Sequence, residues 1–141
     1  MDSGRRRYVF VGDRRSRRAI ALGVQWEDGR LAARTLYDAL RVLGLDPMQQ
    51  IYLNVHRDGE PLTVDEVALE RIRALVAAGE IIVGLGQAVH RTLVREGIGH
   101  LQMIHPAARG AIRARRAYQN HVAAALGRRA MIFSPGEKAT A

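Results

Sequence analysis

Cysteine is absent from this chain of 141 residues. Without a thiol, the chain can form no disulfide, and it offers neither a thiolate-bound zinc site nor a cysteine-held iron–sulfur cluster. Its histidines do not show the paired spacing of zinc ligands; they are His56, His90, His100, His105 and His121. We therefore expect no metal and no cofactor.

Long apolar runs are also missing. No run approaches the roughly 20 residues that a membrane-spanning helix needs, and the basic segment 1–6 leads into a short apolar run instead of a signal-peptide hydrophobic region. The length suits one domain with a proper core. We expect a single domain over 1–141, with its core at about 7–127 and mobile tails at 1–6 and about 128–141. We expect it to be a cytoplasmic monomer without membrane contact.

Lysine is nearly absent, because Lys138 is the only one among 22 basic residues, and the formal net charge is +8. Arginine has a planar fork that grips phosphate with two hydrogen bonds and also stacks on bases. The arginines gather in two clusters, Arg14, Arg15, Arg17 and Arg18, and Arg109, Arg113, Arg115 and Arg116. This clustering favours DNA, single- or double-stranded, as the partner; the alternative is a solvated basic surface.

Short apolar runs at 8–11, 51–55, 81–85 and 101–104 predict strands, since each is stopped by glycine or a polar residue. Their near-continuous apolar character is typical of a parallel sheet covered on both faces. Helical periodicity follows each run: at 31–43, from a capping box at Thr63–Glu66 to Gly79, at 87–96 and at 106–126. The alternation predicts an α/β three-layer sandwich, in which helices flank a short parallel sheet of about four strands.

Polar residues follow the four predicted strands: Asp13, Asn54, Gln87 and His105. In a parallel sheet these residues lie along one edge, where open α/β folds place their sites. Other roles remain open at this point. Asp13 could cap a following helix, Asn54 could stabilise a turn, and His105 could be structural.

Several modest motifs also occur in a particular order. They are Tyr8 to Asp13, Asp28 to Leu31 leading into Leu36 to Leu43, Gly44 to Pro47, Ile51 to Val55, Ile82 to Ala88, and His105 to Ala108. In this order the chain resembles the uracil-DNA glycosylase superfamily over residues 8–126, most closely the branch typified by the iron–sulfur enzymes of thermophiles. The resemblance implies a parallel sheet of order 2-1-3-4 and excision of a damaged base, usually uracil, that is flipped out of DNA.

The resemblance also implies roles for individual residues. The Gly12-Asp13 pair is similar to the first family motif, whose carboxylate positions a water or steadies the cationic sugar. Asn54 is similar to the base-reading asparagine, whose amide has both a donor and an acceptor for uracil. His105 is similar to the histidine that hydrogen-bonds the base carbonyl, a task that a neutral imidazole can perform.

The chain departs from the family pattern at other positions. The stacking aromatic is replaced near Leu31 and Ala32, which leaves Trp26 as the nearby substitute. The segment Arg109-Gly110 falls where the family has a DNA-inserting loop, but it has no apolar wedge.

We therefore predict a DNA glycosylase that hydrolyses the N-glycosidic bond of uracil or another damaged base. Gly12, Trp26, Leu31 and Ala32 would join Asn54 in binding the base, and Gln87 would join the arginines in binding DNA. One alternative is a catalytically inactive nucleic-acid-binding module with this fold. Another is a small enzyme that acts on free nucleosides or nucleotides.

Overall fold

The structure is a computed structural model, and it describes residues 7–107 and 115–127. The expected tails lie outside these residues, as do Arg109, Gly110 and Arg113. Among the described helices, none is both long and apolar enough to cross a membrane.

Four parallel strands form one sheet in the order β2-β1-β3-β4. They are β1 Tyr8–Gly12, β2 Ile51–Asn54, β3 Ile81–Leu85 and β4 Leu101–Met103. Every residue of the central strand β1 is buried, which explains its unbroken apolar sequence. The predicted α/β fold and strand order are confirmed.

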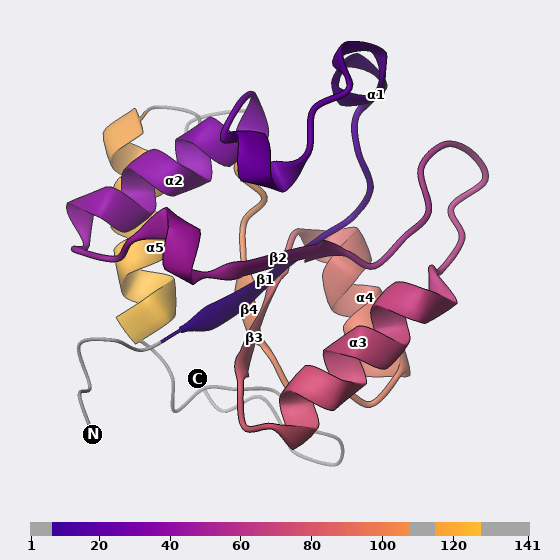
Figure 1. Ribbon diagram of the computed structural model, residues 1–141. Helices are drawn as coiled ribbons and strands as arrows, with labels where there is room; N and C mark the ends of the chain where they lie inside the picture. The colour runs from indigo at the N-terminus through magenta and orange to yellow at the C-terminus, as the bar shows by residue number, and fades with distance from the viewer. Residues whose placement is uncertain (1–6, 108–114, 128–141) are drawn as a thin grey trace.

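Helices cover both faces of this sheet, and Figure 1 shows α2 and α5 on one face and α3 and α4 on the other. The α-helices are α1 Arg17–Leu22, α2 Ala32–Val42, α3 Glu66–Ala77, α4 Gln87–Arg95 and α5 Arg115–Gly127, and the short 3-10 helices are η2 Trp26–Asp28 and η3 Pro47–Gln49. The result is the predicted three-layer arrangement.

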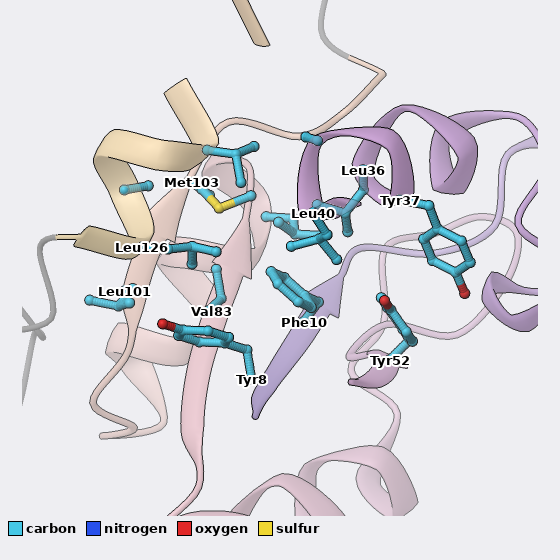
Figure 2. Packing of buried hydrophobic residues seen from close by; sticks show 14 of the residues in the cluster. Tyr8, Phe10, Leu36, Tyr37, Leu40, Tyr52, Val83, Leu101, Met103 and Leu126 are labelled. Carbon is cyan, nitrogen blue, oxygen red and sulfur yellow. The ribbon is translucent and has the colours of Figure 1, made fainter. Parts of the chain in front are cut away.

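Successive side chains of β1 supply the two halves of the core, because a strand turns alternate residues to opposite faces. Tyr8 and Phe10 pack with residues of α2 and α5, including Leu36, Leu40 and Leu126 (Figure 2). Tyr118 and Val122 of α5 belong to the same cluster. Val9 and Val11 pack with residues of α3 and α4, including Leu69, Ile72, Val89 and Leu93. The packing of β1 side chains on both faces of the sheet therefore fixes the position of the sheet edge that carries the polar residues.

The start of α3 differs from the predicted capping box. Asp65 is the N-cap, and its Oδ1 accepts hydrogen bonds from the amides of Val67 and Ala68 at 3.1 and 3.2 Å. The hydroxyl of Thr63 instead donates to the carbonyl of Pro61 at 3.0 Å. The prediction placed the cap two residues too early, because aspartate satisfies the first free amides as well as threonine does.

Two further helix predictions were incomplete. Pro106 and Ala107 lie in a turn, so the helix does not start at Pro106 as predicted, and its described part is α5. The short helix α1 was not predicted, since Ala19 is its only buried residue and it has no apolar stripe. The predicted glycine stops are confirmed, because Gly44 and Gly79 have φ values of 76° and 85° just after α2 and α3.

Candidate active site

The polar residues at the carboxyl ends of three strands meet in one cavity. Asp13 follows β1, Asn54 ends β2 and His105 follows β4, and all three line a cavity of about 390 Å³. The structure thus brings the three predicted catalytic and base-reading residues together. Gln87 is the exposed first residue of α4 and does not line this cavity.

One wall of the cavity comes from Trp26 and Leu31, which lie between α1 and α2, and from Ala32, the first residue of α2. The Trp26 ring stacks on Tyr52, with centroids 5.7 Å apart and planes at 19°. The hydroxyl of Tyr37 also donates to the Trp26 carbonyl at 2.6 Å. These contacts hold Trp26 as a rigid aromatic surface beside the cavity.

Trp26 and Asn54 are joined across Gly12. The indole Nε1 of Trp26 donates to Asn54 Oδ1 at 2.8 Å. A Cβ at Gly12 would lie 2.6 Å from that oxygen and 2.9 Å from Trp26 Cζ2, so only glycine permits this approach.

This contact fixes the Asn54 amide at the wall of the cavity. The Asn54 oxygen keeps a second lone pair, and within the described residues its NH2 group has no hydrogen-bond partner. Instead of stabilising a turn, the Asn54 side chain can donate to a bound molecule.

Leu31 enters the wall with an unusual backbone, having φ 56° and ψ −129° directly before α2. A positive φ is uncommon for a residue with a side chain, and such strain concentrates at functional sites. This conformation lets α2 begin at Ala32 while both residues border the cavity.

His105 is held as a neutral hydrogen-bond donor. Burial lowers its pKa below 6.5, and the nearby Asp13 carboxylate offsets this only in part. The amide of Ala107 donates to His105 Nδ1 at 3.0 Å, so the neutral ring carries its proton on Nε2.

Helix α5 fixes the segment that carries His105. The Ile104 amide donates to His121 Nε2 at 2.8 Å, and the Tyr118 hydroxyl donates to the Ile104 carbonyl at 3.0 Å. Both backbone groups of the residue before His105 are therefore tied to one helix.

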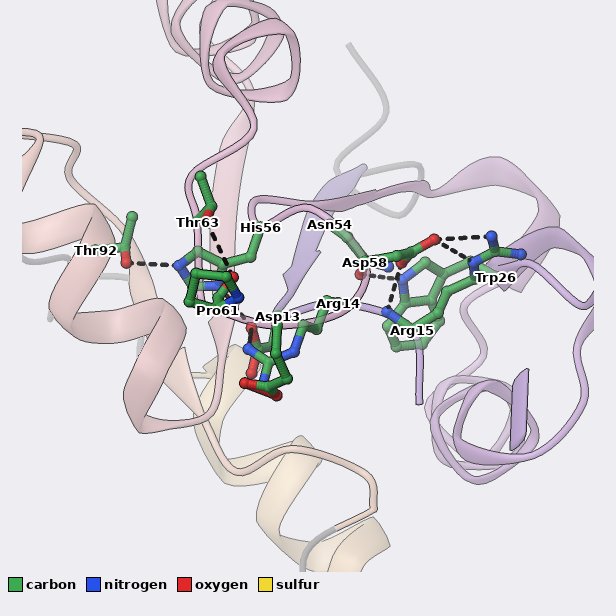
Figure 3. A network of polar contacts seen from close by, with 11 residues as sticks. Asp13, Arg14, Arg15, Trp26, Asn54, His56, Asp58, Pro61, Thr63 and Thr92 are labelled. Atoms are coloured by element: carbon green, nitrogen blue, oxygen red, sulfur yellow. Dashed lines mark hydrogen bonds and ion pairs between the residues drawn. The ribbon is translucent and has the colours of Figure 1, made fainter. Parts of the chain in front are cut away.

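Asp13 is part of a polar chain that the sequence did not reveal (Figure 3). Its Oδ1 lies 2.6 Å from His56 Nδ1, and His56 Nε2 lies 2.8 Å from the Thr92 hydroxyl. Ser16 caps α1, so the helix-capping alternative for Asp13 does not hold. The signal available in the sequence was that His56 follows Asn54 by two residues at the same sheet edge.

The first arginine cluster is partly neutralised within the protein. Arg14 pairs with Glu60 at 2.9 Å, and Arg15 pairs with Asp58 at 2.8 Å, which lowers the pKa of the Asp58 carboxyl. Arg17 and Arg18 are exposed on α1, and Arg18 borders the cavity.

Less can be said of the second cluster. Arg115 is the first residue of α5, and Arg116 is exposed beside it. DNA contact by either cluster stays a prediction.

Within residues 7–107 and 115–127, no group of three or more acidic or histidine side chains is arranged to hold a metal ion. In comparisons with known proteins, no protein-family model matches the chain, and no curated protein matches it either.

Proposed function

We propose that the chain is a DNA glycosylase-like hydrolase that cleaves the N-glycosidic bond of uracil or another damaged base flipped out of DNA. The observation that carries the proposal is that Asp13, Asn54 and His105 line one cavity together with Trp26. Its volume of about 390 Å³ falls within the usual range for small-ligand sites, about 300–1,000 Å³. Base-acting enzymes need such a recess, because the target atoms are inaccessible within a duplex.

Base recognition rests on Trp26 and Asn54. Trp26 supplies an apolar face, and aromatic stacking contributes about 1–3 kcal/mol per base. The Asn54 NH2 group donates to a base carbonyl, while its oxygen accepts from the ring N–H through the lone pair that Trp26 leaves unused.

Departure of the base depends on His105. As the C1′–N bond breaks, its electron pair moves into the base and negative charge develops on a ring carbonyl. The Nε2–H group of His105 donates to that oxygen, and burial keeps the ring neutral.

Asp13 acts at the sugar. Loss of the base leaves oxocarbenium character at C1′, which a nearby carboxylate stabilises. A water oxygen then bonds to C1′, and the proton that it releases passes through Asp13 to the departed base. One Asp13 oxygen contacts His56 and Arg14, and the other has no partner among the residues described.

The direct test is release of free uracil from single- and double-stranded oligonucleotides. We expect His105→Ala and Asp13→Asn to lower turnover by roughly 100-fold or more while DNA affinity changes little, because both residues act on developing charge. A folded wild-type protein that binds DNA but releases neither uracil nor other deaminated bases would instead be an inactive binding module.

One observation favours a second candidate, an enzyme of free nucleosides or nucleotides. Arg14 and Arg15 beside the cavity are paired with Glu60 and Asp58, which leaves fewer cations for a phosphate backbone. Thermal-shift measurements separate the two candidates. If the protein acts on free nucleosides or nucleotides, these should raise its melting temperature more than oligonucleotides do.

A further inference from the structure

We propose that His56, backed by Thr92, is a positioning residue that holds the Asp13 carboxylate with one oxygen turned to the cavity. This inference rests on the proposed function in one respect, namely that Asp13 acts on the bound ligand. The placement of the three side chains stands independently of that function (Figure 3).

The three residues come from different elements and differ in exposure. His56 is 3% exposed just beyond β2, and Thr92 is 3% exposed within α4. The Asp13 side chain, at 31% exposure, faces the cavity. The series of hydrogen bonds therefore runs from Thr92 in the helical layer, through His56, to the Asp13 carboxylate at the site.

His56 is joined to Asp13 twice. Its backbone amide donates to the Asp13 carbonyl at 3.0 Å, and its ring Nδ1 lies 2.6 Å from Asp13 Oδ1. A carboxylate only accepts hydrogen bonds, so Nδ1 carries the proton, and Nε2 of the neutral ring then accepts from the Thr92 hydroxyl at 2.8 Å. Asp13 thus selects the tautomer, and the Thr92 hydroxyl, which can donate or accept, donates to the other ring nitrogen.

The catalytic triad of serine hydrolases also consists of a hydroxyl, an imidazole and a carboxylate hydrogen-bonded in this order. That role does not fit Thr92, because its side chain is buried and lines neither of the two cavities that Asp13 borders. Of the three hydrogen-bonded side chains, only the Asp13 carboxylate is accessible from the cavity. Asp13 therefore acts on the ligand, and His56 and Thr92 orient it.

Orientation matters because a carboxylate on a free side chain rotates among several positions. The short bond to His56 ties one oxygen, and Arg14, which is also paired with Glu60, lies 3.4 Å from the same oxygen. The second oxygen is left toward the cavity, where preorganised negative charge lowers the energy of a developing cation without reorganisation.

The first test uses nitrogen NMR on the ligand-free wild-type protein, so it does not depend on activity. We expect the neutral His56 ring to be protonated at Nδ1, with a proton that exchanges slowly with solvent and loses this protection in Asp13→Ala. A ring protonated at Nε2, or an Nδ1 proton unaffected by Asp13→Ala, would overturn the proposal.

The second test compares donors at the two ring positions, with folding checked by thermal melts. His56→Asn keeps a donor near the place of Nδ1, whereas His56→Gln moves it to the place of Nε2. We expect His56→Gln to lower kcat by roughly 100-fold with little change in KM, and His56→Asn to recover most of the loss, because small displacements of a reacting group are costly. Equal losses in both variants would contradict positioning.

Thr92→Val and Thr92→Ser are a matched pair of variants that test the buried Thr92 hydroxyl, because valine removes the hydroxyl and serine keeps it. Valine removes the hydrogen bond that fixes the far side of the His56 ring, so we expect faster solvent exchange of the Nδ1 proton and a lower kcat, and serine should leave both near wild type. If the wild-type protein releases no base, the proposed function is ruled out. The NMR result would still decide whether His56 positions Asp13.

Discussion

Gly12 has no room for a side chain at the site. A methyl group there would meet Asn54 Oδ1 at 2.6 Å and Trp26 Cζ2 at 2.9 Å. We expect Gly12→Ala to displace both side chains, weaken ligand binding at least tenfold and cost about 1–3 kcal/mol in stability, as overpacking usually does. Gly127→Ala is the control, since no atom of residues 7–107 and 115–127 lies within 4 Å of its Cβ position. Equal ligand affinity in Gly12→Ala and wild type, measured by titration, would disprove this account.

Leu31 offers a test of backbone strain. At a φ of 56°, glycine fits without penalty, whereas alanine retains the strain of leucine. We expect Leu31→Gly to be more stable than Leu31→Ala by about 1 kcal/mol, which reverses the usual order of these residues. Denaturant unfolding of the two variants gives the comparison directly, and the usual order would show that the strain is absent.

His100 should make the protein less stable in acid. Burial lowers its pKa below 6.5, and His90, whose Nδ1 lies 2.9 Å from His100 Nε2, lowers it further. The unfolded chain binds this proton more readily, so the stabilisation is present above the ordinary histidine pKa and is lost as the pH falls below about 6.5. His105 adds a term of the same sign. Denaturant unfolding at about pH 7.5 and about pH 5 should show a larger loss in wild type than in His100→Gln, which takes up no proton.

The residues of the site differed in how far the sequence could reveal them. Asp13, Asn54 and His105 each follow a strand, so a parallel sheet alone brings them to one edge. The partners of Asp13 could not be predicted in this way. His56 and Thr92 lie 43 and 79 positions beyond it in the chain, and their contact depends on where a loop and a helix face settle.

Helix α5 acts on the site as an element, although it contributes none of the residues that line the cavity. It binds both backbone groups of Ile104 through Tyr118 and His121. We expect Tyr118→Phe to lose about 1 kcal/mol of stability and to lower turnover severalfold, because His105 is then held less firmly. Thr63→Val is the control, since it also removes one hydroxyl bond to a backbone carbonyl, that of Pro61 in the loop between β2 and α3. Equal turnover in both variants would show that α5 does not position His105.

Elements with strong apolar patterns were predictable, and those without them were not. The strands and α2 to α4 bury continuous runs or stripes, and their starts and stops were predicted within a few residues. Helix α1 buries only Ala19 and depends on the Ser16 cap, so its arginine-rich sequence resembled a loop. Local capping alternatives, as at Thr63 and Asp65, are decided by how the preceding loop packs.

The sequence sets the net charge of the whole molecule at +8, but the structure decides how many of its arginines are free to bind a partner. Arg14 and Arg15 face the acidic residues Glu60 and Asp58, which come from the loop between β2 and α3. The sequence could not reveal this neutralisation, because the pairs join positions more than 40 residues apart. The basic surface open to a partner is therefore smaller than the composition suggests.

This distribution gives the last prediction, which holds for an active glycosylase and for an inactive DNA-binding module. Each phosphate neutralised by arginine releases counterions, so the log–log slope of DNA affinity against salt should be about −0.9 per contact on duplex and about −0.7 on single strands. Arg17 and Arg18 are both exposed on α1, and Arg18 lines the cavity. The double variant Arg17→Gln/Arg18→Gln should flatten the slope by about two contacts and weaken binding across sequences, while Asn54→Ala should leave the slope unchanged and impair base choice.

The control for this charge removal is Arg41→Gln/Arg73→Gln, which deletes the same charge from the last turn of α2 and from α3. Both arginines make exposed ion pairs, Arg41 with Asp38 and Arg73 with Glu96, and such pairs contribute little stability. Arg41 also lies over the Tyr37 ring, and Arg73 also donates to the Glu96 carbonyl. If the control flattens the slope as much as the α1 variant, the protein attracts DNA through its general charge rather than through the cavity edge. A DNA affinity independent of salt would exclude phosphate binding by the arginines altogether.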